Sequence, residues 1–148
     1  MKFNIESVFD IKEEIQPLLK LHYDEIAHYK DIPLNPDFET YMKLELAGML
    51  RLFTVRTTDE ENLIGYNVFF IKENLHYKDS IQAVQDVVFI KKEYRGRGKE
   101  FIMWCDERLK SDGVNVVYHH VKAAHNFGPM LEKQGYELMD LIYAKKLQ

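Results

Sequence analysis

A strand, a basic turn, a helix and a second strand follow one another over residues 81–121, and this succession limits the fold more than any other part of the sequence. Ile81 to Ile90 is rich in valine and ends in a continuous apolar run, which predicts a centrally buried strand. An amphipathic helix from about Gly98 to Lys110 and a strand over Val114 to Val121 come next. A unit of this kind implies a right-handed crossover and at least one parallel strand pair.

The remaining periodicities place further helices and strands around this unit. The predicted elements are a strand over Lys2 to Phe9, a helix that Asp10 caps and that runs to about Ile26, a helix over Asp37 to Leu50, a hairpin of Leu50 to Thr57 with Leu63 to Lys72, a short helix over Asn126 to Gln134 and a last strand over Tyr136 to Leu147. The order is βααβββαβαβ, a mixed α/β (α+β) fold. No repeat or linker interrupts it, so residues 1–148 are expected to form a single domain.

Composition excludes several classes of function. The formal net charge of −4 argues against general binding of nucleic acid, so any basic site has to be local. No apolar run approaches the roughly 18 residues of a membrane span, and no membrane partner is expected. Cys105 is the only cysteine and cannot form an internal disulfide, which fits a reducing compartment and predicts a cytoplasmic protein.

The turn between the central strand and the following helix carries a dense positive charge. Its five basic residues surround one acid, Glu93; they are Lys91, Lys92, Arg95, Arg97 and Lys99. Gly96 and Gly98 allow a ligand to approach the backbone, and the start of a helix favours an anion. The turn lacks the third glycine of a dinucleotide fingerprint and the Gly-Lys-Ser/Thr of a P-loop. It predicts a pyrophosphate site, and the alternative is a solvated turn without a ligand.

The run Arg95-Gly96-Arg97-Gly98-Lys99-Glu100 after an apolar strand resembles the R/Q-x-x-G-x-G/A motif of the GNAT superfamily of acyl-CoA N-acyltransferases. The family prefers Gly or Ala where this chain has Glu100. The resemblance is specific over residues 81–136. It implies that the fourth and fifth strands splay around acetyl-CoA, the acyl-donor co-substrate, and that the residues contacting it are Val88, Phe89, Ile90, Arg95, Gly96, Arg97, Gly98, Lys99 and Asn126.

Two side chains are candidates for proton transfer in such a reaction. Asp86 lies in the central strand, where some members of the family place a carboxylate base, and its alternative is a solvent-facing residue or an ion pair. His120 is a candidate acid, base or relay, with neighbouring His119 as its rival. Leu131 stands where the family usually has the tyrosine that acts as general acid. Another group would therefore have to protonate the thiolate: Tyr118, Tyr136, Tyr143 or water. Adjacent histidines in a strand point to opposite faces, and no metal site is predicted.

The leading hypothesis is an N-acetyltransferase that moves an acetyl group from acetyl-CoA directly to a primary amine of a small molecule or protein in a ternary complex. By the same resemblance, polar aromatic residues of the first helix and the connection after it would help to shape the acceptor pocket: His22, Tyr23, His28 and Tyr29. The alternative is that they only pack the helix against the edge of the sheet or cover that edge. Alternatives are a catalytically degenerate acyl-CoA-binding regulator and a protein-interaction module. The family also includes homodimers, but no feature of the sequence predicts one here.

Overall fold

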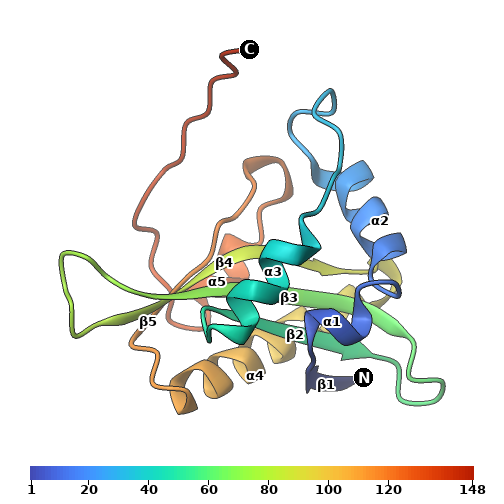
Figure 1. Ribbon diagram of the computed structural model, residues 1–148, viewed down its shortest axis with the longest axis horizontal. Helices are drawn as coiled ribbons and strands as arrows, with labels where there is room; N and C mark the ends of the chain where they lie inside the picture. The colour runs from blue at the N-terminus through green and yellow to red at the C-terminus, as the bar shows by residue number, and fades with distance from the viewer.

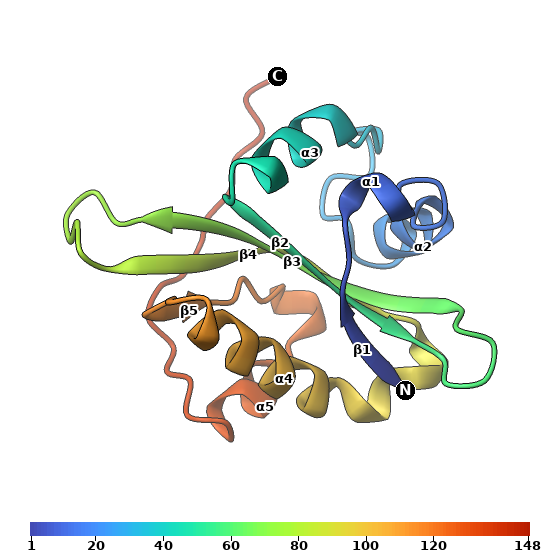
Figure 2. The same cartoon turned by 60° about the horizontal axis from the view of Figure 1, so that its bottom comes forward.

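The computed structural model describes residues 1–148, which fold as a five-stranded sheet with helices on both faces (Figures 1 and 2). The strands lie in the order β1-β2-β3-β4-β5. They are β1 (Lys2–Ile5), β2 (Leu50–Arg56), β3 (Leu63–Glu73), β4 (Ile81–Ile90) and β5 (Val116–Tyr118). The helices are α1 (Val8–Ile11), α2 (Gln16–Ile26), α3 (Phe38–Leu46), α4 (Gly98–Ser111) and α5 (Gly128–Glu132), with 3₁₀ turns η1 (Lys92–Arg97) and η2 (Ala123–His125). None of the helices has the length and apolar character to span a bilayer.

The pairing of the strands confirms the predicted fold class. Strands β1 to β4 pair antiparallel in sequence order, so the predicted hairpin of β2 and β3 is present. Strand β5 pairs parallel to β4 after the α4 crossover. The sheet is therefore mixed, as the strand, turn, helix and strand of residues 81–121 require.

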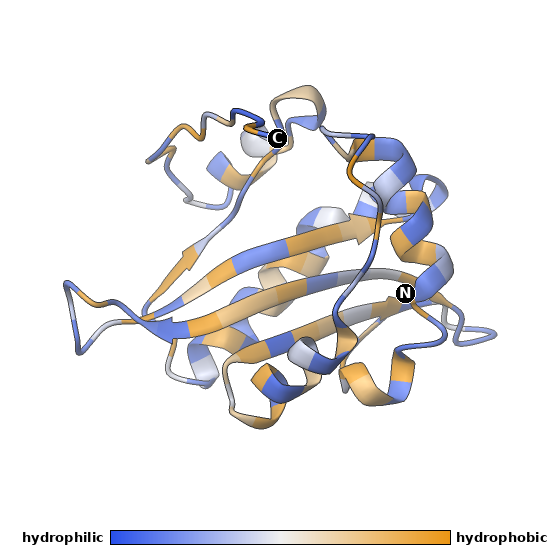
Figure 3. Cartoon of the chain, turned by 45° about the horizontal axis from the view of Figure 1, so that its top comes forward, coloured by the Kyte–Doolittle hydropathy of each residue, from blue (hydrophilic) through white to orange (hydrophobic).

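An apolar core lies between each face of the sheet and the helix layer that packs on it. On one face, α1 to α3 pack on Leu50, Leu52 and Tyr66, while on the other face α4 packs on Phe53 and Phe69. Figure 2 shows the two helix layers on opposite sides of the sheet, and Figure 3 shows apolar residues concentrated on the central strands. Alternate residues of β2 to β4 thus serve different cores, which explains their nearly continuous apolar character.

The N-terminal elements differ from the predicted ones. The first strand ends at Ile5 because the Ser7 side chain accepts a hydrogen bond from the Phe9 amide and caps α1. The predicted single helix is split in two, since α1 ends at Ile11 and α2 begins at Gln16. Pro17 occupies the first turn of α2, a position where the missing N–H costs nothing.

The prediction of a last strand over Tyr136 to Leu147 is wrong for this structure. No helix or strand follows α5, and no backbone group from Glu137 onward makes a hydrogen bond within the chain. A strand needs a partner, and the neighbouring β5 has only three residues instead of the predicted span of Val114 to Val121. The C-terminal segment, residues 137–148, therefore runs away from the sheet as extended chain (Figure 1).

Candidate active site

A gap opens beside the second half of β4. Strand β5 pairs only with Gln82 to Val84, so from Gln85 to Ile90 the edge of β4 that faces β5 has no strand beside it. The same stretch contains a β-bulge: Val68 of β3 faces Val87, Phe69 faces Gln85, and Asp86 between them has no partner. Bulges reorient side chains and commonly adjoin active sites. Strand β4 therefore continues past the end of β5, which leaves this edge unpaired.

Gln85 closes the narrow end of this gap. Its Oε1 lies 2.7 Å from His119 Nδ1, and its Nε2 donates to the backbone carbonyl of His120 at 3.5 Å. Because an amide oxygen only accepts, His119 carries its proton on Nδ1. The His119 ring packs against Phe69 and Tyr136, and burial lowers its pKa to about 4, so it is neutral and structural at pH 7. His120 is exposed beyond the end of β5.

Asp86 is held from the opposite helix layer. The hydroxyl of Tyr41, on α3, donates a short hydrogen bond to Asp86 Oδ2, and both side chains are half-buried. Burial, with the bond to Asp86, raises the pKa of Tyr41, so this hydroxyl remains a donor across the physiological range. The arrangement orients the second carboxylate oxygen of Asp86 without consuming it. Tyr41 stands on no motif, and only its spatial proximity to the bulge identifies it.

A histidine and a tyrosine pack on Phe89, farther along β4 on the face covered by α1 to α3. His22 of α2 stacks on Phe89 with ring centroids 5.0 Å apart, and its Nδ1 lies 2.6 Å from the hydroxyl of Tyr66. Burial lowers the pKa of His22 to about 4, partly opposed by Glu25, so the ring is neutral at pH 7. Burial also raises the pKa of Tyr66. Of these residues, sequence analysis had identified His22 and missed Tyr66.

The other polar aromatic residues of this region hold the chain rather than face β4. The Tyr23 hydroxyl donates to the carbonyl of Lys30 at 2.7 Å and fixes the start of the α2–α3 connection. His28 and Tyr29 pack edge to face with ring centroids 4.6 Å apart. Only His22 among the four predicted acceptor residues therefore contacts the strand that lines the gap.

Arg95 joins the basic turn to α2. Its Nε donates to the Ile90 carbonyl at 2.9 Å, and its guanidinium lies over the Phe89 ring and pairs with Glu25 at 2.6 Å. The bond from Arg95 lowers the pKa of Glu25, which stays ionised. An anion that binds Arg95 has to share it with Glu25.

The carboxylate at the sixth position of the motif pairs with an arginine of the same motif. Glu100 accepts a hydrogen bond from Arg97 Nε at 2.8 Å, on the exposed first turn of α4. The unusual carboxylate is thus neutralised by the arginine of the same motif. The lysines of the turn, Lys91, Lys92 and Lys99, make no ion pair within the chain, so three positive charges stay available.

Neither glycine of the turn is required by the protein's own packing. A Cβ on Gly96 would have no heavy atom within 4 Å, and one on Gly98 would only approach Ile90 Cδ1 at 4.0 Å. Neither glycine has a positive φ. The absence of side chains instead leaves open space at the start of α4. The Gly98 amide donates to the Arg95 carbonyl within η1, and no side chain caps the N–H groups that follow in the first turn of α4. These residues fit a pyrophosphate.

The remaining candidates lie around α5. Asn126 Oδ1 accepts from the Gly128 amide at 2.8 Å, which supports the start of α5 and leaves its own NH₂ group free. Leu131 is buried in the position of the family's tyrosine. The Tyr136 hydroxyl donates to Asp106 at 2.7 Å, that of Tyr118 accepts from Gln82, and Tyr143 is exposed in the C-terminal segment.

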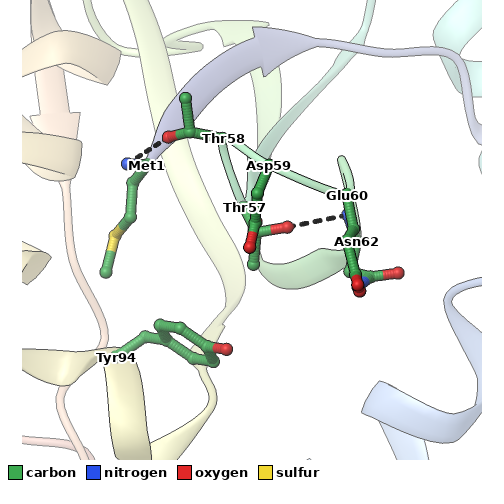
Figure 4. A pocket seen from close by; sticks show the side chains of 7 residues that line it. All are labelled: Met1, Thr57, Thr58, Asp59, Glu60, Asn62 and Tyr94. Atoms are coloured by element: carbon green, nitrogen blue, oxygen red, sulfur yellow. Dashed lines mark hydrogen bonds between the residues drawn. The ribbon is translucent and has the colours of Figure 1, made fainter.

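Two open pockets flank the basic turn. One, of about 470 Å³, lies between α2 and the end of β4 and is lined by Leu21, Asp24, Glu25, Phe89, Lys91, Lys92 and Glu93. The other, of about 300 Å³, lies at the β2–β3 turn beside the N-terminus, with Tyr94 as its only wall from η1 (Figure 4). The first pocket shares Phe89 with the gap, so it adjoins the candidate site.

Comparisons with known proteins identify the fold. No family model matches the sequence, and no curated protein is significantly similar to it. Among solved structures, the chain is similar to a ribosomal-protein-alanine N-acetyltransferase from Brucella melitensis biovar Abortus 2308, with 16% identity, a TM-score of 0.69, and coverage of 99% of this chain and 100% of that one.

Two further acetyltransferases give the same result. An aminoglycoside acetyltransferase from an uncultured soil metagenomic sample has 15% identity, a TM-score of 0.74, and coverage of 99% and 96%. Glucosamine-6-phosphate N-acetyltransferase from Arabidopsis thaliana has 14% identity, a TM-score of 0.72, and coverage of 100% of both chains. The chain therefore has the fold of these acetyltransferases over its whole length.

Proposed function

We propose that this protein is an N-acetyltransferase of the GNAT superfamily that transfers an acetyl group from acetyl-CoA to a primary amine. The observation that carries the proposal is the free edge of β4, which leads from the bulge at Asp86 directly into an open glycine turn at the start of α4. A free strand edge suits an extended amide-containing ligand, and the turn suits its pyrophosphate.

The residues for the donor follow the strand and the turn. The backbone of Val88 to Ile90 would pair with the amide groups of the pantetheine arm, as an added strand does. Arg95 to Lys99 would hold the pyrophosphate through backbone N–H groups and side-chain charge, and the free NH₂ of Asn126 would add a contact from the other side of the gap. Two of these charges are partly committed, because Arg95 pairs with Glu25 and Arg97 pairs with Glu100.

The residues for proton transfer lie at the bulge. Asp86, oriented by Tyr41, would accept a proton from the acceptor ammonium directly or through water, which frees the nitrogen lone pair for attack on the thioester carbonyl. A backbone N–H of Val88 to Ile90 would donate to the oxyanion. The C–S bond then breaks, and a water molecule carries the second nitrogen proton of the tetrahedral intermediate to the departing thiolate. His120, exposed beside the gap, would relay protons to solvent.

The acceptor would enter on the side of α2 and α3. There His22 covers Phe89, and the 470 Å³ pocket between α2 and β4 offers the carboxylates Asp24, Glu25 and Glu93. Lys91 and Lys92 line the same pocket and Glu25 pairs with Arg95, so the lining sets no strong charge preference. The acceptor would be a primary amine of a small molecule or of a protein side chain. Reaction would take place in the cytoplasm, where buried Cys105 stays reduced.

Isothermal titration with acetyl-CoA at moderate salt, followed by acetylation of an amine panel, tests the proposal. Wild type should bind in the micromolar range, and Arg95→Glu should lose binding because the charge beside the Ile90 carbonyl is reversed. Binding together with turnover supports the enzyme. Binding without turnover on any amine would indicate an acyl-CoA-binding regulator, and no binding would indicate an interaction module.

A further inference from the structure

The last carbonyl group on the free edge of β4 already accepts a hydrogen bond from the chain itself. The Lys91 amide donates to the Ile64 carbonyl at 2.9 Å, which directs the peptide groups of Lys91 towards β3. Peptide groups of successive residues in a strand point to opposite edges, so the Ile90 carbonyl points to the edge that has no neighbouring strand. Arg95 Nε donates to this carbonyl at 2.9 Å. Arg95 therefore occupies one end of the edge proposed for the pantetheine arm.

Glu25 on α2 fixes Arg95 in this position. Its two carboxylate oxygens lie 2.6 Å and 2.7 Å from the two terminal nitrogens of the guanidinium. Such a paired contact fixes the orientation of a guanidinium as well as its charge. The guanidinium also lies over the Phe89 ring, 5.6 Å from its centroid. The Arg95 side chain thus connects α2 to the edge of β4.

A diphosphate requires the same N–H groups of Arg95. A guanidinium has five N–H groups, and an anion binds it best through two adjacent ones. One adjacent pair is used by Glu25, and the other includes the Nε–H that donates to Ile90. A diphosphate can therefore bind Arg95 through two N–H groups only after one of these contacts breaks. The ion pair is partly exposed, with 41% of the Arg95 and 31% of the Glu25 side chain accessible, so a ligand can replace it at modest cost.

We infer that Glu25 competes with the diphosphate of the donor for Arg95 and thereby lowers the affinity of the site for every diphosphate ligand. The inference rests on the proposed donor site. On binding, the diphosphate takes the guanidinium from Glu25, and an amide N–H of pantetheine replaces Arg95 Nε at the Ile90 carbonyl. Coenzyme A supplies both groups, whereas a free nucleotide such as ADP supplies only the diphosphate. Competition from Glu25 therefore disfavours nucleotides, because they lack the pantetheine contacts that compensate for the broken ion pair.

Calorimetry with coenzyme A and with ADP measures this competition in the whole chain. Glu25→Gln removes the charge that holds Arg95, so both ligands should bind about three- to tenfold more tightly than to wild type. The two factors should be similar, because the same ion pair is broken in both cases. A gain of affinity is not expected from a helix that has merely been damaged. Equal or weaker binding of both ligands to Glu25→Gln would overturn the inference.

Asp24→Asn is the matched control. Asp24 precedes Glu25 on α2, lines the same pocket and carries the same charge, but it pairs with Lys20 instead of Arg95. This variant should leave both affinities unchanged, and tightening equal to that of Glu25→Gln would show a general charge effect and contradict the competition. Coenzyme A binding that Glu25→Gln leaves unchanged would overturn only the competition. ADP binding that tightens in Glu25→Gln, in a protein that never binds coenzyme A, would support the competition and overturn the acetyltransferase proposal.

Discussion

Two half-buried histidines with lowered pKa values should make the protein sensitive to mild acid. His22 and His119 each have a pKa lowered to about 4 by burial, against about 6.5 in an unfolded chain. The unfolded state therefore binds more protons between these values, and stability falls as pH decreases from about 6.5 towards 4. At pH 5 an unfolded histidine is nearly all charged and the folded one is mostly neutral. Because pH 5 lies about 1.5 units below the unfolded pKa and still above the folded one, the loss of stability is about 2 kcal/mol for each residue.

Urea unfolding at pH 7 and pH 5, followed by circular dichroism, measures this loss. Wild type should lose about 4 kcal/mol from the two histidines together, on an order-of-magnitude scale. His119→Asn keeps a donor for the Gln85 oxygen but removes the titration, so this variant should lose about 2 kcal/mol less than wild type over the same interval. His28→Asn, at an exposed position, serves as the control. If His119→Asn and His28→Asn both follow wild type, the neutral buried imidazole described here is wrong.

Further variants test the donor site, the bulge and the sheet. Lys99→Glu at the start of α4 should weaken acetyl-CoA binding about tenfold or more in calorimetry. Lys110→Glu makes the same charge change at the other end of this helix and should have little effect on binding. Equal losses in the two variants would indicate only an effect of net charge. Tyr41→Phe removes the hydrogen-bond donor to Asp86 and should lower kcat about tenfold in a thiol-release assay, with little change in KM for acetyl-CoA. An unchanged kcat would refute the role of Tyr41 in orienting Asp86. Gly65→Ala would place a Cβ 2.8 Å from the Phe89 carbonyl oxygen. The variant should therefore lose about 1 to 3 kcal/mol of unfolding free energy in urea and should also bind acetyl-CoA more weakly. Unchanged stability would show that the β4 backbone can shift to accommodate the methyl group.

The sequence predicts the central unit well because its determinants are local. Alternation, a glycine turn and an amphipathic stripe over residues 81–121 suffice for β4, α4 and β5, and a crossover between strands of one sheet leaves few other arrangements. The prediction of the last strand was wrong because its determinants are not local. Its apolar pattern at residues 136–147 is clear, but a strand exists only with a partner, and pairing is not a local property.

The candidate site also combines features that are local in sequence with contacts between distant residues. The basic turn is contiguous, so its lysines and glycines can be read directly from the sequence. The Tyr41 bond to Asp86 spans 45 residues, and the Tyr66 contact with His22 spans 44, so no spacing rule could reveal either. Adjacent His119 and His120 have the same residue type, and only packing shows that one is buried and neutral while the other is exposed.

A crystal structure of the protein grown with saturating coenzyme A examines the proposed donor site most directly. We expect the pantetheine amides to bond to the backbone of Val88 to Ile90 on the free edge of β4, with the diphosphate within hydrogen-bond distance of the Gly96 to Lys99 backbone. Coenzyme A bound elsewhere, or a gap that stays empty at saturation, would contradict the proposed acetyltransferase site.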